Sequence, residues 1–394
     1  IKGPKTCGKI IMNNLTIAFV LGTRPEILKF SAVIKTAKKM GVQAILVHTG
    51  QHYDHNMSEV FFKDLNLPEP NIFIGIGSGN QAYQTGSALV EVEKYFLQNR
   101  PDVVAVLGDT NAAVSGALAA CKLGIPVAHY EAGARSYDWN MPEEINRRLL
   151  DSISRFCFAP TELCLNRLKY EGREADSTYI GDTLVETALP VSECLDDPGI
   201  LLKKYGTAKN GYGLLTIHRA ENTDSATRLT SIISALNEIN YPVLFPVHPR
   251  TRKKLEEYNL KKYISNLTVI DPLPYTSFMN LIISSKFIVT DSGGVQQEAA
   301  IFGKHFLTVR NNTEWMETIF LAGNTLVKAD KAEIKSKINL ILNGDVKKNL
   351  QNPFELGASE KSLKILLKAK ENGSLLYQSS NFFEKSYDDH LSNN

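Results

Sequence analysis

The stretch LTIAFVLGTRPEILKFSAVIKTAKKM, residues 15–40, decides the fold of this 394-residue chain. It opens with an almost wholly apolar run that lacks polar alternation, which is typical of a strand buried on both faces of a parallel sheet. A glycine follows, and the next residues have the spacing of an amphipathic helix. The stretch therefore predicts a strand, a tight turn and a helix, the repeating unit of an α/β fold.

The same unit recurs along the whole chain in two series, interrupted between Asp182 and Gly213. Strict alternation in both halves predicts an α/β fold with two Rossmann-like, doubly wound parallel-sheet domains that face a common cleft. The expected strands lie at residues 15–22, 44–50, 102–109, 126–133, 156–160 and 177–182, and then at 213–218, 242–248, 267–270, 287–293 and 305–310.

The length and the interruption set the expected domain boundaries, because 394 residues exceed one ordinary core. We expect an unstructured arm or tag over 1–14 and an N-terminal domain with the catalytic carboxylates over 15–185. A C-terminal domain that binds the nucleotide is expected over 186–365. The last part, 366–394, is expected to be a helix and a polar tail that packs back on the N-terminal domain.

The composition excludes several classes of protein. A net charge of +2 predicts no general polyanion-binding surface, so no nucleic-acid partner is expected. No apolar run approaches the roughly 20 residues that span a bilayer, so no membrane partner is expected. Five cysteines without a Cys-x-x-Cys pair favour reduced thiols in a cytoplasmic protein. Histidines and acidic residues do not stand at metal-ligand spacing, so no metal site is expected.

Carboxylates gather where two neighbouring strands are expected to end, which is where open parallel sheets bind ligands. Asp109 ends one strand, Glu131 the next, and Glu143 stands at a helix start. Crowding raises the pKa of at least one carboxyl, so one group can act as base and another as acid. Asp109 alone could instead cap a helix, and Glu143 could ease a helix dipole.

Other charged residues surround these carboxylates in the sequence. We interpret Glu144 as the helix-start residue and Arg147 as its partner. Arg24, Arg135 and Arg147 supply the positive charge that proton transfer at a carbon centre needs.

A helix start in TDSGGVQQEAA is the more persuasive anion site. Ser292, Gly293 and Gly294 let backbone N–H groups approach a phosphate where the helix begins. Glu298, about one turn further on, is placed to accept hydrogen bonds from sugar hydroxyls. The lysine of a nucleoside-triphosphatase P-loop is missing from this segment, which excludes that class.

Basic side chains stand at the remaining strand ends. Arg24 and Lys29, in GTRPEILK, could meet an anion at the first helix. His218 and Arg219 follow one strand and His248 the next, and each histidine could bind phosphate, move a proton or stabilise a loop.

Two loops carry weaker signals. IGIGSGN, residues 74–80, resembles a dinucleotide fingerprint, but it is not expected to follow the first strand or to lead straight into a helix. We therefore interpret it as a flexible loop that could touch substrate. His52, in TGQHYDH, stands in an equally polar loop, and its role stays open.

The order of these motifs resembles a known family. GTRPE-x-x-K, TGQH, GDT, EAG-x-R, PEE-x-NR, HR-x-EN, HP, DSGG-x-Q-x-E and R-x-x-TE follow one another from residue 22 to 314. This series looks like the non-hydrolysing UDP-N-acetylglucosamine 2-epimerases and covers nearly the whole chain. The stretches HPRTRK and NPFELGASEK look particularly like archaeal members.

The resemblance implies a glycosyltransferase-B-type fold and a homodimer, with a UDP-sugar as substrate and neither NAD nor a metal as cofactor. It implies inversion at C2 of UDP-N-acetylglucosamine to give UDP-N-acetylmannosamine, by anti elimination of UDP to 2-acetamidoglucal and syn re-addition. Asp109, Glu131, Glu143 and His218 match catalytic residues. The predicted substrate-binding residues are Arg24, Lys29, Arg135, Arg219, His248, Phe278, Ser292, Gly293, Gly294 and Glu298.

Alternatives stay open at this point. The substrate could be a related UDP-2-acetamido sugar of the diacetamido-uronic acid type, or the enzyme could hydrolyse the intermediate. A glycosyltransferase would not need the carboxylates, and a nucleotide-sugar sensor would be expected to have lost them. Trp315 stands where bacterial members of the family carry an arginine. The segment HYDHNM also differs from the bacterial members that bind a second UDP-sugar as an activator. Trp139 is interpreted either as a wall over the sugar or as part of a packed loop.

Overall fold

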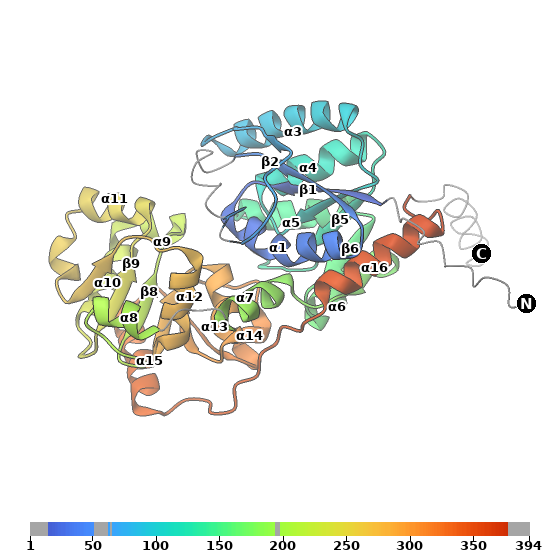
Figure 1. The fold of residues 1–394 in the computed structure, drawn as a ribbon. Helices are drawn as coiled ribbons and strands as arrows, with labels where there is room; N and C mark the ends of the chain where they lie inside the picture. Colours follow the sequence, from blue (N-terminus) through green and yellow to red (C-terminus); the bar gives the residue numbers. More distant parts are fainter. Residues whose placement is uncertain (1–14, 51–61, 64, 194–197, 377–394) are drawn as a thin grey trace, which may run out of the picture.

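The structure is a computed structural model that describes residues 15–50, 62–63, 65–193 and 198–376. The arm before Leu15 and His52 lie outside the described residues. Two separate sheets form, each with helices on both sides (Figure 1). All the strand pairs described are parallel, which confirms the predicted α/β class with two doubly wound domains.

The N-terminal sheet has the strand order β3-β2-β1-β4-β5-β6-β7, so the order reverses between β1 and β4. Along β1, Ile17 and Phe19 face one core and Ala18 and Val20 face the other, as expected for a strand buried on both faces. The strands are β1 Thr16–Leu21, β2 Gln43–His48, β3 Ile72–Phe73, β4 Val103–Leu107, β5 Val127–Tyr130, β6 Phe156–Ala159 and β7 Ser177–Tyr179. The helices are α1 Arg24–Lys39, α3 Gln81–Gln98, α4 Asn111–Lys122, α5 Pro142–Ile153, α6 Glu162–Tyr170 and α7 Thr183–Glu193, with a 3₁₀ turn η1 at Glu174–Asp176.

The C-terminal sheet repeats this plan with the order β10-β9-β8-β11-β12-β13, so its order reverses between β8 and β11. Ligands bind at such reversal points because the connecting loops diverge there. The strands are β8 Gly213–Thr216, β9 Val243–Pro246, β10 Leu267–Ile270, β11 Phe287–Thr290, β12 His305–Val309 and β13 Gly323–Val327. The other elements are α8 Pro198–Lys204, α9 Ala220–Thr223, α10 Ala226–Asn237, α11 Pro249–Glu257, η2 Lys261–Ile264, α12 Tyr275–Ser284, α13 Gly293–Ile301, α14 Met316–Phe320, α15 Lys331–Asn343 and α16 Ala358–Glu371.

The last helix, α16, returns from the C-terminal domain and packs along α1 of the N-terminal domain (Figure 1). Its first turn is held by Glu186 of α7, whose carboxylate accepts hydrogen bonds from the backbone N–H groups of Gly357 and Ser359 at 2.9 and 3.0 Å. The phenol of Tyr130, at the end of β5, donates to Ser362 at 3.0 Å. Helix α16 therefore contacts both α7 and the end of β5, the strand that directly precedes the predicted catalytic residue Glu131.

Two features differ from the expectation drawn from the sequence. The edge strands β3 and β13 were not predicted, since β3 has only two residues and β13 begins with glycine and asparagine. The segment IGIGSGN does lead straight into a helix, because Asn80 caps α3 by accepting from the N–H of Tyr83 at 2.9 Å. Within the described residues, no helix is both long and apolar enough to cross a membrane.

Candidate functional site

Glu131 lies directly after β5 in a conformation that few residues adopt. Its φ is +65°, in the left-handed region where a non-glycine residue is strained. Its carboxylate forms an ion pair with the buried Lys29 of α1. It also lies 3.4 Å from the position that a Cβ atom would take at Gly108, directly after β4. The backbone therefore holds Glu131 over the turn that carries Asp109.

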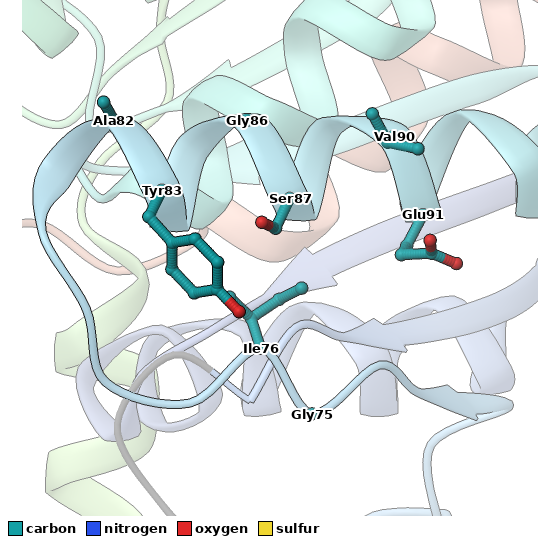
Figure 2. Close-up of a pocket in the computed structure, with 8 residues that line it drawn as sticks. All are labelled: Gly75, Ile76, Ala82, Tyr83, Gly86, Ser87, Val90 and Glu91. Carbon is teal, nitrogen blue, oxygen red and sulfur yellow. The ribbon is translucent and has the colours of Figure 1, made fainter.

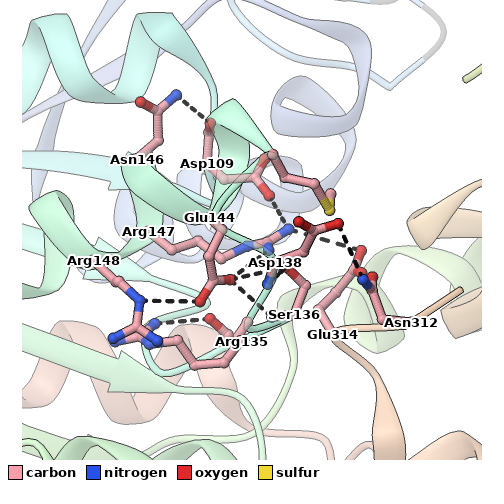
Figure 3. A network of polar contacts seen from close by, with 12 residues as sticks. Asp109, Arg135, Ser136, Asp138, Glu144, Asn146, Arg147, Arg148, Asn312 and Glu314 are labelled. Atoms are coloured by element: carbon pink, nitrogen blue, oxygen red, sulfur yellow. Dashed lines mark hydrogen bonds and ion pairs between the residues drawn. The ribbon is translucent and has the colours of Figure 1, made fainter. Parts of the chain in front are cut away.

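Asp109 does not cap helix α4. The cap of α4 is Thr110, whose hydroxyl accepts from the N–H of Ala113 at 3.0 Å. The Asp109 carboxylate instead meets Nη2 of Arg147 at 2.5 Å, and its side chain stays 28% exposed (Figure 3). A carboxylate that faces a cleft and is not used for capping can take part in chemistry.

Helix α5 presents its two glutamates in different ways. Glu143 lies in the first turn and is partly exposed. Glu144 is fully buried and accepts from the N–H of Ser136 at 2.8 Å, from Arg147 at 3.2 Å and from Arg148 at 3.1 Å. The prediction that Arg147 is the partner of Glu144 is confirmed, and Glu144 serves to hold the loop before α5.

Arg135 does not face the cleft, which corrects its place among the predicted substrate-binding residues. It is 1% exposed, and its Nη2 lies 2.6 Å from both Asp151 and Glu171 in the interior of the N-terminal domain. The arginine that contacts Asp109 is Arg147, which the sequence analysis placed near the carboxylates but did not include among the substrate-binding residues. Its position four residues after Glu143, on the same helical face, was the available signal.

Arg135 belongs to a platform formed by His129, Arg135, Asp151 and Glu171, in which the first three side chains are buried and that of Glu171 is 25% exposed. The His129 ring contacts Asp151 at 2.7 Å through Nδ1 and the carbonyl oxygen of Gly108 at 2.8 Å through Nε2. Burial raises the pKa of Asp151, but His129 and Arg135 outweigh it and leave that pKa below its ordinary value. Through His129, the platform thus holds the backbone of the turn at Gly108 in place.

Across the cleft, the start of α13 has the form of an anion site. Ser292 caps the helix and accepts from the N–H of Val295 at 3.4 Å. A Cβ atom at Gly294 would meet open space, whereas one at Gly293 would lie 2.7 Å from Oε1 of Glu314. The N–H groups of this first turn, with the positive end of the helix dipole, favour a phosphate at this position.

Asp291, which precedes this turn, organises the loop after β8. It is completely buried and accepts from the N–H groups of His218 and Arg219 at 3.1 and 3.0 Å and from Asn222 at 3.1 Å. Nδ1 of His218 lies 3.5 Å from the same carboxylate. Burial, with Arg219 and Arg250, lowers the pKa of His218, although Asp291 raises it in part.

The other residues predicted to bind substrate lie on this side of the cleft or next to it. His248 caps α11 by accepting from the N–H of Arg250 at 3.2 Å, and its ring lies 5.5 Å from that of His218. Phe278 is half-buried on α12 and packs against the core. Burial raises the pKa of Glu298 on α13 to about 7, although Tyr275 and the positive charge of Arg24 lower it in part.

Side chains of the two domains contact each other in one polar network (Figure 3). Nη2 of Arg147 lies 3.9 Å from Oε1 of Glu314, and Asn312 donates to Asp138 at 3.4 Å. Nζ of Lys29 lies 5.7 Å from the centre of the Trp315 ring. Trp315 is buried, and the sequence analysis assigned it no function. Residues next to the predicted proton-transfer carboxylates therefore contact the loop that packs against the predicted diphosphate turn.

A separate hollow of about 550 Å³ lies between the loop after β3 and helix α3 (Figure 2). Gly75 and Ile76 of the glycine-rich segment line it, with Tyr83, Val90 and Glu91 from the helix. None of the predicted site residues is among its described lining residues. The prediction that this segment touches substrate therefore gains no support from the hollow.

The sequence is similar to proteins of one activity class. A family model described as UDP-N-acetylglucosamine 2-epimerase matches residues 34–368. A UDP-N-acetylglucosamine 2-epimerase of Methanocaldococcus jannaschii is 42% identical, over 90% of this chain and 100% of that protein. A UDP-2,3-diacetamido-2,3-dideoxy-D-glucuronate 2-epimerase of Pseudomonas aeruginosa is 44% identical, over 80% of this chain and 89% of that protein.

Solved structures give the same relationship. The M. jannaschii UDP-GlcNAc 2-epimerase in complex with UDP-GlcNAc and UDP matches with a TM-score of 0.83 at 42% identity, covering 89% of this chain and 99% of that one. A glycosyltransferase of Rickettsia africae, 16% identical with a TM-score of 0.58, shares the fold alone, as expected for a glycosyltransferase-B-type architecture. The family indicated by the order of the motifs is thus confirmed. The chain belongs to the UDP-N-acetylglucosamine 2-epimerase family.

Proposed function

We propose that this protein is an isomerase that reversibly converts UDP-N-acetylglucosamine into UDP-N-acetylmannosamine. A base removes the proton from C2 while the anomeric C1–O bond breaks, and UDP leaves with the bonding electrons in an anti elimination. The 2-acetamidoglucal that results regains a proton at C2, and UDP adds back at C1 in a syn addition. The products differ from the substrate only in configuration at C2.

The carboxylates are the groups proposed to move the proton. Glu131 and Asp109 lie after neighbouring strands, and each is held by a cation, Lys29 and Arg147 respectively. Glu143, partly exposed on the first turn of α5, is the third candidate. A positioned carboxyl group contributes about 10²- to 10⁴-fold to such a step.

The start of α13 is proposed to hold the diphosphate that leaves and returns. Negative charge develops there as the C1–O bond breaks, and the backbone N–H groups and arginines stabilise it. His218, beside Asp291, is proposed to donate or accept a proton next to this diphosphate. Glu298 is proposed to accept hydrogen bonds from the ribose.

One observation carries the proposal: Arg147, which contacts Asp109, lies 3.9 Å from Glu314, and Glu314 packs against the start of α13. A base on one side and a diphosphate site on the other are what elimination of UDP requires. This contact between the domains also supports retention of the glucal until UDP adds back.

A proton NMR time course in deuterated water tests this function. With UDP-N-acetylglucosamine as substrate, deuterium should appear at C2 of both epimers, and no free sugar should accumulate. Glu131→Gln and Asp109→Asn should abolish the exchange, whereas Glu171→Gln, in the platform, should retain it. Absence of exchange with the unaltered protein would overturn the mechanism, and free N-acetylmannosamine with UDP would indicate a hydrolysing enzyme.

A second substrate is favoured by the P. aeruginosa relative, which acts by name on a UDP-2,3-diacetamido-2,3-dideoxy-D-glucuronate and is 44% identical. That sugar carries a carboxylate at C6, which would need a cation near the sugar. The same NMR experiment with equal concentrations of both UDP-sugars gives the ratio of their kcat/KM values directly. Faster exchange with the uronate would replace UDP-N-acetylglucosamine as the proposed substrate and leave the chemistry unchanged.

A further inference from the structure

Glu314 lies where three arginines converge. Its carboxylate contacts Arg310 at 2.7 Å, Arg219 at 3.8 Å and Arg147 at 3.9 Å. The side chain is almost fully buried. A lone arginine would suffice to neutralise one buried carboxylate, so the convergence of three points to a role beyond neutralisation.

The three arginines come from both sides of the cleft. Arg219 and Arg310 belong to the C-terminal domain, after β8 and β12, whereas Arg147 belongs to α5 of the N-terminal domain. Glu314 itself packs against the first turn of α13, since its Oε1 would touch a Cβ atom at Gly293. The carboxylate thus joins the proposed diphosphate turn to an arginine of the opposite domain.

Arg147 contacts both Glu314 and Asp109. One nitrogen, Nη2, lies 2.5 Å from Oδ2 of Asp109 and 3.9 Å from Oε1 of Glu314. The other, Nη1, lies 3.2 Å from Glu144, so the guanidinium is held between carboxylates of its own helix and of the other domain (Figure 3). Charged groups of both domains therefore contact this guanidinium.

We propose that Glu314 is a positioning residue that orients Arg147, and through it Asp109, when the two domains close over the substrate. The inference rests on the proposed function, because it concerns the proton that Asp109 moves. Burial raises the pKa of the Glu314 carboxyl, but the arginines outweigh this and hold it well below its usual range, so the negative charge is present throughout the working pH range.

The charge can be removed without changing the shape of the side chain. Glu314→Gln should lower kcat roughly 10-fold to 100-fold, the range of coupling between contacting charged residues, and change KM less than about threefold. Glu314→Asp, which keeps the charge, should restore part of kcat. The matched control is Glu317→Gln, because Glu317 also contacts the other domain, through Thr161, but none of these arginines.

A double-mutant cycle decides through which arginine Glu314 acts. In an Arg147→Lys background, Glu314→Gln should lower kcat less than about threefold, whereas in an Arg310→Lys background it should keep most of its effect. Thermal unfolding of each variant identifies any loss that comes from misfolding, and Glu314→Asp then serves as the alternative probe.

If the effects of Glu314→Gln and Arg147→Lys on kcat are additive, the inference is overturned. It is also overturned if Glu314→Gln is non-additive with Arg310→Lys but not with Arg147→Lys. Either result would leave the proposed function standing. An unaltered protein that exchanges no C2 proton with either UDP-sugar would overturn both. These two failures are therefore distinguishable in one set of measurements.

Discussion

Two charged networks lie beside the turn at Gly108, and they differ in which domains supply their side chains. The platform of His129, Arg135, Asp151 and Glu171 draws its side chains from the N-terminal domain alone. The cleft cluster of Asp109, Glu144, Arg147 and Glu314 crosses between the domains and leaves Asp109 28% exposed. The first network supports the turn, and the second joins the residues after it to the other domain through Arg147 and Glu314.

The difference shows how similar ion pairs can have separate roles. A buried pair whose partners are all internal becomes costly when one partner is lost, because the remaining charge cannot reach water. A cluster at a cleft can exchange partners when ligand binds or the domains move. Changes in the platform should therefore appear in stability, and changes in the cleft should appear in kcat.

The largest expected effect is in the cleft. Glu131→Gln should lower kcat by about 10²- to 10⁴-fold, because an amide cannot take the C2 proton. UDP affinity, measured by titration calorimetry, should change less than about threefold, since the diphosphate turn is on the other domain. Glu171→Gln is the matched control and should change kcat less than threefold. An equal loss of UDP affinity would make Glu131 a binding residue and remove the contrast between the networks.

The next effect is in the platform. Asp151→Asn should lower the free energy of unfolding by about 3 kcal/mol, because His129 and Arg135 both lose their buried carboxylate and Arg135 keeps only Glu171 as a charged partner. Urea denaturation measures this loss, and the kcat of protein that remains folded should fall less than tenfold. A stability within 1 kcal/mol of the unaltered protein would show that the platform is not structural.

Glu298 offers a pH-dependent test on the far side of the cleft. Its pKa is raised from 4.5 to about 7 in the folded state, so its contribution to stability is full below pH 4.5 and is lost as the pH rises through 7. Glu298→Gln should remove up to about 3 kcal/mol of this pH dependence. Denaturation at pH 5 and at pH 8 gives the difference, and unchanged pH dependence in the variant would contradict the assignment.

The smallest effect is expected at Trp139. This side chain is 63% exposed and lies 4.6 Å from the guanidinium of Arg148, outside the cleft contacts described above. Trp139→Ala should lower stability by about 0.5–1 kcal/mol, the strength of an exposed cation–π contact. It should change KM and kcat less than threefold. A rise in KM above tenfold would restore Trp139 as a wall over the sugar.

Much of the fold could be predicted because it depends on local patterns. The apolar run before Gly22 and the helical period after it determine a buried strand and its helix, and the same holds for most later units. The edge strands β3 and β13 could not be predicted, since short or polar edges carry little hydrophobic signal.

The site was predictable only in part. Polar residues after buried strands, such as Asp109 and Glu131, were identified because parallel topology brings strand ends to one edge of a sheet. Arg135 was misplaced, since both it and Arg147 follow the same strand and only the packing shows which side chain turns inward.

The sequence by itself determined two α/β domains and the family to which the chain belongs, and it predicted the strand ends at which we propose the chemistry takes place. The tertiary structure alone decided which arginine meets Asp109, and that Glu314 reaches it from the other domain. The physical reason is range: hydrophobic period and turn chemistry act over a few residues, whereas these charge contacts join groups far apart in the chain. Such contacts exist only once both domains have folded and their sheets face each other.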